Sequence, residues 1–396
     1  YSWLYLFDIK TFQLENVRLS FQGEKFINER YNALFLDKNS RIWAATESSL
    51  LFFQNNDNHF HFIKNNSPTT FEPFKEVRAF VEDTLGNYWM ATSSGLTYWD
   101  TKKQTFKTLT ATDGALDKMN HASIRGLVFD GTYLIIGQTN KGIWLYDPVR
   151  KLYKRPVYEN SEAGLELKQK IEKDFVNQIY PLKNGNHVVA ARDGAYILDG
   201  KTYQLSALRF NGENDIVKFA YESSRGNLFL GTLKGLYCLD TTYREVYNIV
   251  EDFNNPYIIS FLEYKDDYYI GTAEGIYTLT EKNNTPQVQK IIPKLTDTWI
   301  NSIFSDKNRN IWIVAFDKIC LYQPQQELLN CFSETENVLG NPYVSNAFYQ
   351  SSNEQVFLGA ANGITYFYPN KISSNPALLK PKIKYLRIPE KQSNIK

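Results

Sequence analysis

The chain has 396 residues, with 44 basic and 43 acidic side chains, so its formal net charge is +1. Balanced charge argues against a protein built mainly to bind nucleic acid, and a hydrophobic content of 43% argues against a disordered chain. Aromatic residues make up 15% of the sequence, and their preference for strands indicates a β protein. The sequence contains no run of roughly 18 apolar residues, the length that a helix needs to cross a bilayer.

In chain order, the first segments look like half of a unit that recurs later. Residues 2–8 and 12–19 read as a third and a fourth strand, without the two strands that precede them elsewhere. The sequence starts at Tyr1 with neither a Met nor an apolar leader. We expect either a ring that closes by borrowing strands across the termini or, as the favoured interpretation, a piece of a longer repeat array.

The complete unit is clearest at Val77–Asp83, Tyr88–Thr92 and Leu96–Asp100, three short strands joined by polar turns. A fourth, aromatic-rich strand follows the third strand. The bulky residue of the second strand recurs every 40 to 53 residues, which is the spacing of propeller blades. Its eight occurrences are Trp43, Trp89, Ile135, Val188, Phe229, Tyr269, Trp312 and Phe357.

Small residues recur two positions after the bulky one, where a short side chain lets neighbouring blades approach closely; Val314 departs from this pattern. The small residues are Ala45, Ala91, Gly137, Ala190, Gly231, Gly271 and Gly359. A turn glycine with positive φ is expected four or five residues later, at Gly95, Gly142, Gly194, Gly235, Gly275 and Gly363. Ser49 and Lys318 hold that place in two units, for which we expect another turn type.

An Asp often ends the third strand, where its carboxylate can accept backbone hydrogen bonds in an Asx turn. These residues are Asp8, Asp100, Asp147, Asp199 and Asp240. Eight units of four short strands predict an all-β fold, a β-propeller with a seven- or eight-bladed ring. A β-sandwich would not keep one register over eight copies.

Two stretches interrupt the repeat. Residues 55–73 are polar, and residues 158–174 form the longest segment between blades, where apolar spacing predicts a short surface helix within 162–175. After Tyr368 the chain becomes rich in proline, and residues 382–388 alternate like a new strand.

Sequence motifs for nucleotide, metal or nucleophile chemistry are missing, and we assign no catalytic residue. His59 and His61 lack partners at metal spacing, so we expect no metal site and no cofactor. Cys238 and Cys320 fall in third strands and should behave as small core residues. Cys331 lies in the strand after Cys320, which makes a cross-strand disulfide between them conceivable.

The repeat resembles the two-component regulator propeller family, whose unit contains a bulky residue, Gly-Thr, a turn glycine and a final Asp. Segments 227–240 and 269–277 carry it most closely, and 357–369 is similar to the family's final blade. In that family the propellers form the periplasmic sensor region of Bacteroides-type hybrid histidine kinases and precede an immunoglobulin-like sandwich. The resemblance therefore implies a partial blade at 1–20, propeller repeats at 21–370, and a linker with the first sandwich strand at 371–396.

The same resemblance implies two seven-bladed rings, one running from about Val77 onward and one holding the earlier units; a single eight-bladed ring is the competing arrangement. It also implies a periplasmic region of a membrane-anchored inner-membrane sensor, working as a homodimer. Its ligand would be an oligosaccharide that regulates glycan-utilisation genes, and we expect no nucleic acid contact by this region.

Candidate ligand groups should come from loops, because most aromatic residues fall on strand positions that pack between blades. The turns between second and third strands share a face with the entries to first strands. That face should present Arg78, Arg125, Asn177, Arg192, Asp193, Lys234, Glu274, Trp299, Asn301, Phe316 and Asp317. Two alternatives stay open: a glycan-degrading propeller enzyme, in which Asp193, Glu274 and Asp317 converge, and a protein-interaction scaffold.

Overall fold

The computed structural model has two compact units, Tyr1–His59 and Phe60–Lys396. It describes residues 60–64, 75–103, 105–109, 123–212, 215–250, 252–253, 255–282, 285–333, 338 and 342–372, together with the strands of the first unit. Those strands are β1 (Tyr5–Asp8), β2 (Gln13–Asn16), β3 (Ser20–Phe21), β4 (Glu24–Lys25), β5 (Tyr31–Leu36), β6 (Arg41–Thr46) and β7 (Leu50–Gln54).

In the first unit, β1 pairs with β2 in an antiparallel ladder, as predicted for segments 2–8 and 12–19. β5, β6 and β7 form a three-stranded antiparallel sheet that matches the first three strands of the repeat. A short antiparallel pair joins β3 and β4. The predicted turn at Ser49, the side chain of Asp8, His59 and the predicted strand at 382–388 lie outside the described residues.

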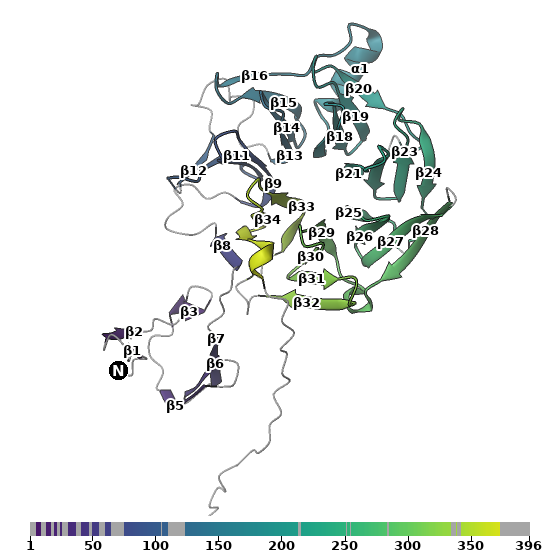
Figure 1. Ribbon diagram of the computed structural model, residues 1–396. Helices are drawn as coiled ribbons and strands as arrows, with labels where there is room; N and C mark the ends of the chain where they lie inside the picture. The colour runs from purple at the N-terminus through teal and green to yellow at the C-terminus, as the bar shows by residue number, and fades with distance from the viewer. Residues whose placement is uncertain are drawn as a thin grey trace, which may run out of the picture. The chain divides into compact units, whose positions relative to one another are not determined.

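The second unit is a seven-bladed β-propeller, and each blade among its described residues is a four-stranded antiparallel sheet (Figure 1). The innermost strands are β9 (Val77–Glu82), β13 (Ile124–Phe129), β17 (Val176–Pro181), β21 (Val217–Glu222), β25 (Ile258–Tyr264), β29 (Ile300–Ser305) and β33 (Tyr343–Gln350). The second strands are β10 (Tyr88–Thr92), β14 (Leu134–Gln138), β18 (His187–Ala191), β22 (Leu228–Thr232), β26 (Asp267–Thr272), β30 (Ile311–Ala315) and β34 (Val356–Ala360).

Two further layers complete the blades. The third strands are β11 (Gly95–Asp100), β15 (Gly142–Asp147), β19 (Gly194–Leu198), β23 (Leu236–Leu239), β27 (Gly275–Lys282), β31 (Ile319–Gln323) and β35 (Gly363–Phe367). The outermost strands are β12 (Thr105–Thr108), β16 (Leu152–Lys154), β20 (Leu205–Leu208), β24 (Glu245–Ile249), β28 (Thr285–Ile291), β32 (Leu328–Phe332) and β8 (Phe60–Lys64).

The seventh blade closes the ring with β8, a strand that precedes the first blade in sequence. β8 pairs with β35 and places Phe60 opposite Phe367. The prediction that each unit supplies its own fourth strand is therefore wrong for the last unit, where Pro369 begins a 3₁₀ turn, η5 (Pro369–Lys371). β8 covers the edge that β35 would otherwise expose. The ring has seven blades and starts at Phe60 rather than near Val77.

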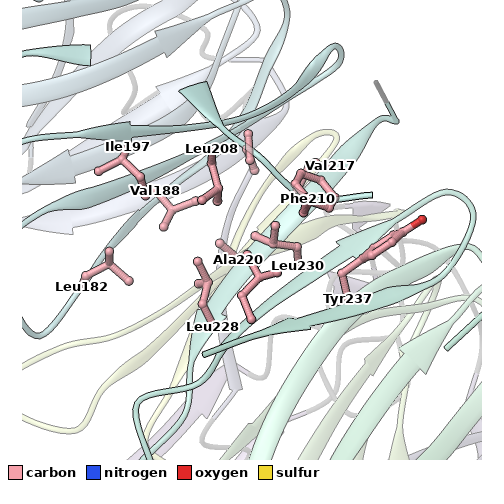
Figure 2. Packing of buried hydrophobic residues seen from close by; sticks show 13 residues of the cluster. Leu182, Val188, Ile197, Leu208, Phe210, Val217, Ala220, Leu228, Leu230 and Tyr237 are labelled. Carbon is pink, nitrogen blue, oxygen red and sulfur yellow. The ribbon is translucent and has the colours of Figure 1, made fainter. Parts of the chain in front are cut away.

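Apolar side chains fill the space between neighbouring blades. Between the third and fourth blades, Val188 and Ile197 belong to the same buried cluster as Leu228 and Leu230 (Figure 2). The repeated bulky residues of the seven blades are all buried, from Trp89 to Phe357. The aromatic excess of the sequence is therefore mostly core.

The small residues and turn glycines have the predicted roles. A side chain at Gly137 would collide with Val176 of the next blade, and one at Gly359 with the backbone of Val77. The turn glycines have positive φ, from 63° at Gly142 to 155° at Gly363. Close blade packing and tight turns thus explain why these positions recur.

The predicted Asx turns are present at four third-strand ends, those of Asp100, Asp147, Asp199 and Asp240. In each, the Asp Oδ1 accepts backbone N–H groups two to four residues on, at 2.7–3.1 Å. These carboxylates therefore hold turns.

The predicted helix is α1 (Glu162–Ile171), which begins after the N-cap Ser161 and ends before residue 175. No helix among the described residues is long and apolar enough to span a membrane. Cys320 and Cys331 are cross-strand partners joined by a disulfide, the pairing that the sequence left open, and Cys320 lies in the core as expected. Cys238 is free and buried.

Candidate ligand-binding face

In six blades the innermost strand contains one extra residue near its start. The pairing with the second strand shifts register there, as between Val77 and Ala79 in β9. The residues left unpaired by this shift are Arg78, Arg125, Asn177, Lys218, Ile259 and Asn301. A β-bulge re-aims the side chain of its extra residue, and bulges are frequent beside functional sites. We call these six positions the bulge ring.

Hydrogen bonds join the turns between second and third strands to the entries of the innermost strands. The backbone N–H of Arg192 donates to the carbonyl of Phe175, and that of Thr139 donates to the carbonyl of Ser123, both at 2.9 Å. These turns and entries therefore lie at the same end of the blades, which we call the entry face. The opposite end, with the other two turns of each blade, is the exit face.

Two arginines of the bulge ring reach the segment that leads into the next blade. Arg78 is 9% exposed, and its guanidinium contacts the Ser123 hydroxyl and, at 2.6 Å, the Glu76 carboxylate. The Arg125 guanidinium lies 4.8 Å from the centroid of the Phe175 ring. Burial and the charge of Arg78 lower the pKa of Arg125. The Nε atoms of both arginines are buried without a hydrogen-bond partner among the described residues.

Lys218 holds the same bulge position in the fourth blade. Its ammonium lies 5.6 Å from the centroid of the Tyr257 ring. Burial, with a smaller contribution from the charge of Arg125, lowers the pKa of Lys218 to about 8. Arg125 and Lys218 belong to the second and fourth blades, so their charges interact past the third blade between them. Tyr257 in turn meets Trp299 edge to face, with ring centroids 5.2 Å apart.

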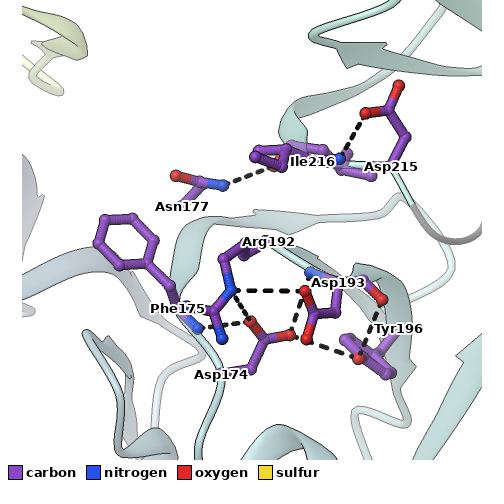
Figure 3. Close-up of polar contacts among 9 residues, drawn as sticks. Asp174, Phe175, Asn177, Arg192, Asp193, Tyr196, Asp215 and Ile216 are labelled. Carbon is purple, nitrogen blue, oxygen red and sulfur yellow. Dashed lines mark hydrogen bonds and ion pairs between the residues drawn. The ribbon is translucent and has the colours of Figure 1, made fainter.

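The two amides of the bulge ring hold neighbouring blades together. The Asn177 Nδ2 donates to the Val217 carbonyl at 2.8 Å (Figure 3). Asn301 is 2% exposed, and its Oδ1 accepts a hydrogen bond from the Ser345 hydroxyl at 2.9 Å. Ile259 is apolar, so the positive charge of the bulge ring comes from the first, second and fourth blades.

The third blade holds a buried carboxylate behind the entry face (Figure 3). Asp174 is 0% exposed and accepts hydrogen bonds from the backbone N–H groups of Phe175 (2.6 Å) and Asp193 (3.3 Å). The Arg192 Nε lies 3.8 Å from its Oδ1. Burial raises the pKa of Asp174, and the hydrogen bond from Phe175 opposes that rise. Asp174 therefore anchors the turn that carries Arg192 and Asp193.

The structure brings together five of the predicted site residues. Arg78, Arg125, Asn177 and Asn301 belong to the bulge ring, and Trp299 joins it through Tyr257. The other six lie in turns on the entry face, at Arg192, Asp193, Lys234, Glu274, Phe316 and Asp317. No hydrogen bond or ion pair of the described residues joins the three acids that an enzyme would require.

Sequence reasoning missed Lys218 and Tyr257. Lys218 occupies the same repeat position as Arg78 and Arg125, directly after the β-branched residue that starts the strand. An alignment of the repeats at that position would have found it. Tyr257 precedes β25 in the segment that leads into the fifth blade.

A cavity of about 470 Å³ lies on the axis of the ring. Its lining comes from all seven innermost strands and includes the aromatic rings of Phe219, Phe261 and Phe348. The six residues of the bulge ring do not line it. The bulge ring and the largely apolar cavity are therefore separate parts of the propeller.

Carboxylates mark the exit ends of three innermost strands, at Glu82, Glu222 and Glu263. Each accepts a hydrogen bond from the backbone N–H of a turn in the adjacent blade, at 2.6–3.0 Å. Glu263 also accepts one from the Ser224 hydroxyl at 2.5 Å.

Solved structures share this fold. The extracellular domain of a hybrid two component system from B. thetaiotaomicron matches with a TM-score of 0.68 at 19% identity, over 92% of this chain and 48% of that one. A second such domain from the same bacterium gives 0.60 at 16% identity, over 77% and 39%. A streptogramin B lyase gives 0.57 at 11% identity, over 78% and 97%.

The predicted likeness to propellers of two-component sensors is thereby confirmed at the level of the fold. The chain spans about half the length of the first of these extracellular domains and less of the second. No protein-family model matches the sequence, and no curated protein matches it.

Proposed function

We propose that the propeller is the ligand-sensing region of a hybrid two-component sensor and binds an oligosaccharide at its entry face. The observation that carries this proposal is the meeting of aromatic rings and unsatisfied polar groups around one end of the axis. Tyr257 and Trp299 offer apolar faces, and Arg78 and Arg125 offer buried donors. Ligand sites combine such apolar surfaces with a few fixed polar groups.

The fold supports the same proposal. Two structural neighbours are extracellular domains of two component systems, which fits an extracytoplasmic, periplasmic location for this region of a membrane-anchored protein. In the proposed sensor, the oligosaccharide biases the packing of two protomers and so regulates glycan-utilisation genes.

Titration calorimetry against oligosaccharides from plant and host polysaccharides tests the proposal. We expect one class to bind, and we expect Trp299→Ala to weaken that binding about tenfold through the lost aromatic contact. Lys102→Gln is the control, because Lys102 is exposed in a turn on the exit face. Failure of the whole panel to bind contradicts the proposal.

The same incubations separate a sensor from a glycan-degrading enzyme. A sensor returns each oligosaccharide unchanged, so product analysis should find no shorter chains. Cleavage that disappears on changing Asp193, Glu274 or Asp317 would favour the enzyme.

A further inference from the structure

We propose that the bulge ring selects oligosaccharides bearing an anionic oxygen group, a carboxylate or a sulfate, and seats that group among Arg78, Arg125 and Lys218. This inference rests on the proposed function and adds the charge of the ligand to it. We call these three side chains the basic triad.

The bulge ring contains three basic side chains and no carboxylate. Among the described residues, Glu76 is the one carboxylate bonded to the basic triad, and it engages Arg78. Lys218 forms no ion pair with a described carboxylate. A cation held away from water is unfavourable unless an anion pairs with it. A bound anionic group would supply the missing partner.

The donors of the triad suit an oxyanion. The planar guanidinium of an arginine presents parallel N–H groups that match two oxygens of a carboxylate or sulfate, and an ammonium adds a point charge. The buried Nε atoms of Arg78 and Arg125 have no partner among the described residues. The charge of Arg125 interacts with that of Arg78 and with that of Lys218, which makes its guanidinium the centre of the triad.

Aromatic rings beside the triad favour a sugar as the carrier of the anion. The Tyr257 ring lies next to the Lys218 ammonium and meets the Trp299 ring. The Arg125 guanidinium lies over the Phe175 ring. A sugar ring contacting these apolar faces would place its charged substituent toward the triad.

The backbone at Glu76, just before the first blade, holds this residue beside Arg78. Glu76 has a φ of 42°, in the left-handed region that a non-glycine residue rarely adopts. Its N–H donates to the Ala361 carbonyl of the seventh blade at 3.0 Å, which fixes it in place. Glu76 is thus held against Arg78 and its charge also reaches Arg125, whereas no described carboxylate pairs with Lys218.

Titration calorimetry at fixed ionic strength with trigalacturonate and its carboxyl-reduced, neutral form tests the inference, with a sulfated disaccharide as a separate arm. We expect an acidic ligand to bind at least about tenfold more tightly than its neutral counterpart. Arg125→Gln should remove that preference, and Lys218→Met should reduce it, whereas Lys102→Gln should leave it intact. Binding in the uronate or the sulfate arm identifies the source of the anion.

Thermal unfolding in inorganic sulfate, against chloride at equal ionic strength, probes the triad without a sugar. We expect saturable stabilisation of the unmodified chain that Arg125→Gln abolishes. Equal stabilisation of the unmodified protein and the Arg125→Gln variant overturns the inference. Equal affinity for acidic and neutral sugars also overturns it, but leaves the proposed function standing. Sulfate binding at the triad without any oligosaccharide binding keeps the anion site and removes the proposed function.

Discussion

Three innermost strands carry a glutamate at the exit face and three carry a basic residue in the bulge ring at the entry face, and the two groups differ in their hydrogen bonding. At the exit face, the carboxylates of Glu82, Glu222 and Glu263 each accept backbone hydrogen bonds from an adjacent blade. At the entry face, the guanidinium Nε atoms of Arg78 and Arg125 lack partners among the described residues. The innermost strands therefore fasten neighbouring blades at one end and hold donors without described partners at the other.

Local backbone geometry explains this difference. At the exit end the innermost strands stay in register with their neighbours, as where Glu82 pairs with Tyr88. At the entry end each of six strands contains a bulge, which changes the direction of one side chain. A single register shift, repeated around the ring, therefore converts a structural strand into one that presents a side chain near the axis.

Lys218→Met should change stability more than any other substitution proposed below, because it removes a cation without a described ion-pair partner from the entry end. The burial that lowers the pKa of Lys218 from 10.5 to about 8 also opposes folding. Replacing this lysine should therefore raise the free energy of unfolding at pH 7 by up to about 3 kcal/mol. Chemical denaturation measures this change, with Lys102→Met as the control for an exposed lysine. A clear loss of stability would show that Lys218 has a partner in the folded protein.

Glu263→Ala tests the other end. The substitution removes the acceptor for the Ser224 N–H and hydroxyl, and we expect it to lower the free energy of unfolding by about 1–2 kcal/mol. Oligosaccharide affinity should not change, because Glu263 lies on the exit face. Glu263→Gln keeps one acceptor and should recover part of the loss. Weakened ligand binding in both variants would contradict the separation of the two ends.

The pH dependence of stability should also distinguish the entry end. Between pH 8 and about 10 the unfolded chain holds the proton of Lys218 and the folded chain releases it, so stability rises with pH. The rise should amount to about 1 kcal/mol between pH 8 and 9. Arg125 and Tyr257 face this lysine and remain in place in Lys218→Met. Subtracting the profile of that variant therefore isolates the effect, and identical profiles would exclude it.

Phe316→Ala should have the smallest effect. Phe316 is 54% exposed in a turn of the entry face and is not part of the bulge ring. We expect its free energy of unfolding to stay within about 0.5 kcal/mol and its oligosaccharide affinity to stay within a few-fold. A loss of affinity as large as that of Trp299→Ala would extend the site outward from the axis to the turns.

Repetition made much of the fold predictable. Positions such as Gly137 and Asp147 recur with one physical role, so eight copies reinforce a signal that is weak in one. Ring closure was not predictable in this way, because Phe60–Lys64 lies in a polar stretch and pairs with a strand some 300 residues away. Neither local propensity nor repeat spacing specifies such a long-range partner.

For the candidate site, the sequence identifies residues at the strand entries but not the bulges that join them. Arg78, Arg125, Asn177 and Asn301 were identified because strand entries share a face, and the structure joins them through the bulges. The bulge itself was not visible, since a register shift depends on pairing with the neighbouring strand. From the sequence alone, Lys218 is indistinguishable from an ordinary strand residue, and the turn residue Glu274 is as strong a candidate as Arg125.

The pKa of the Lys218 ammonium, followed by NMR with and without trigalacturonate, reports on anion binding at the triad. We expect a value of about 8 in the free protein, because burial disfavours the charged form, and a clear rise when the acidic sugar binds. The neutral, carboxyl-reduced sugar should leave the value where it was. An ordinary lysine pKa that responds to neither sugar would contradict an anion-binding triad at the entry face.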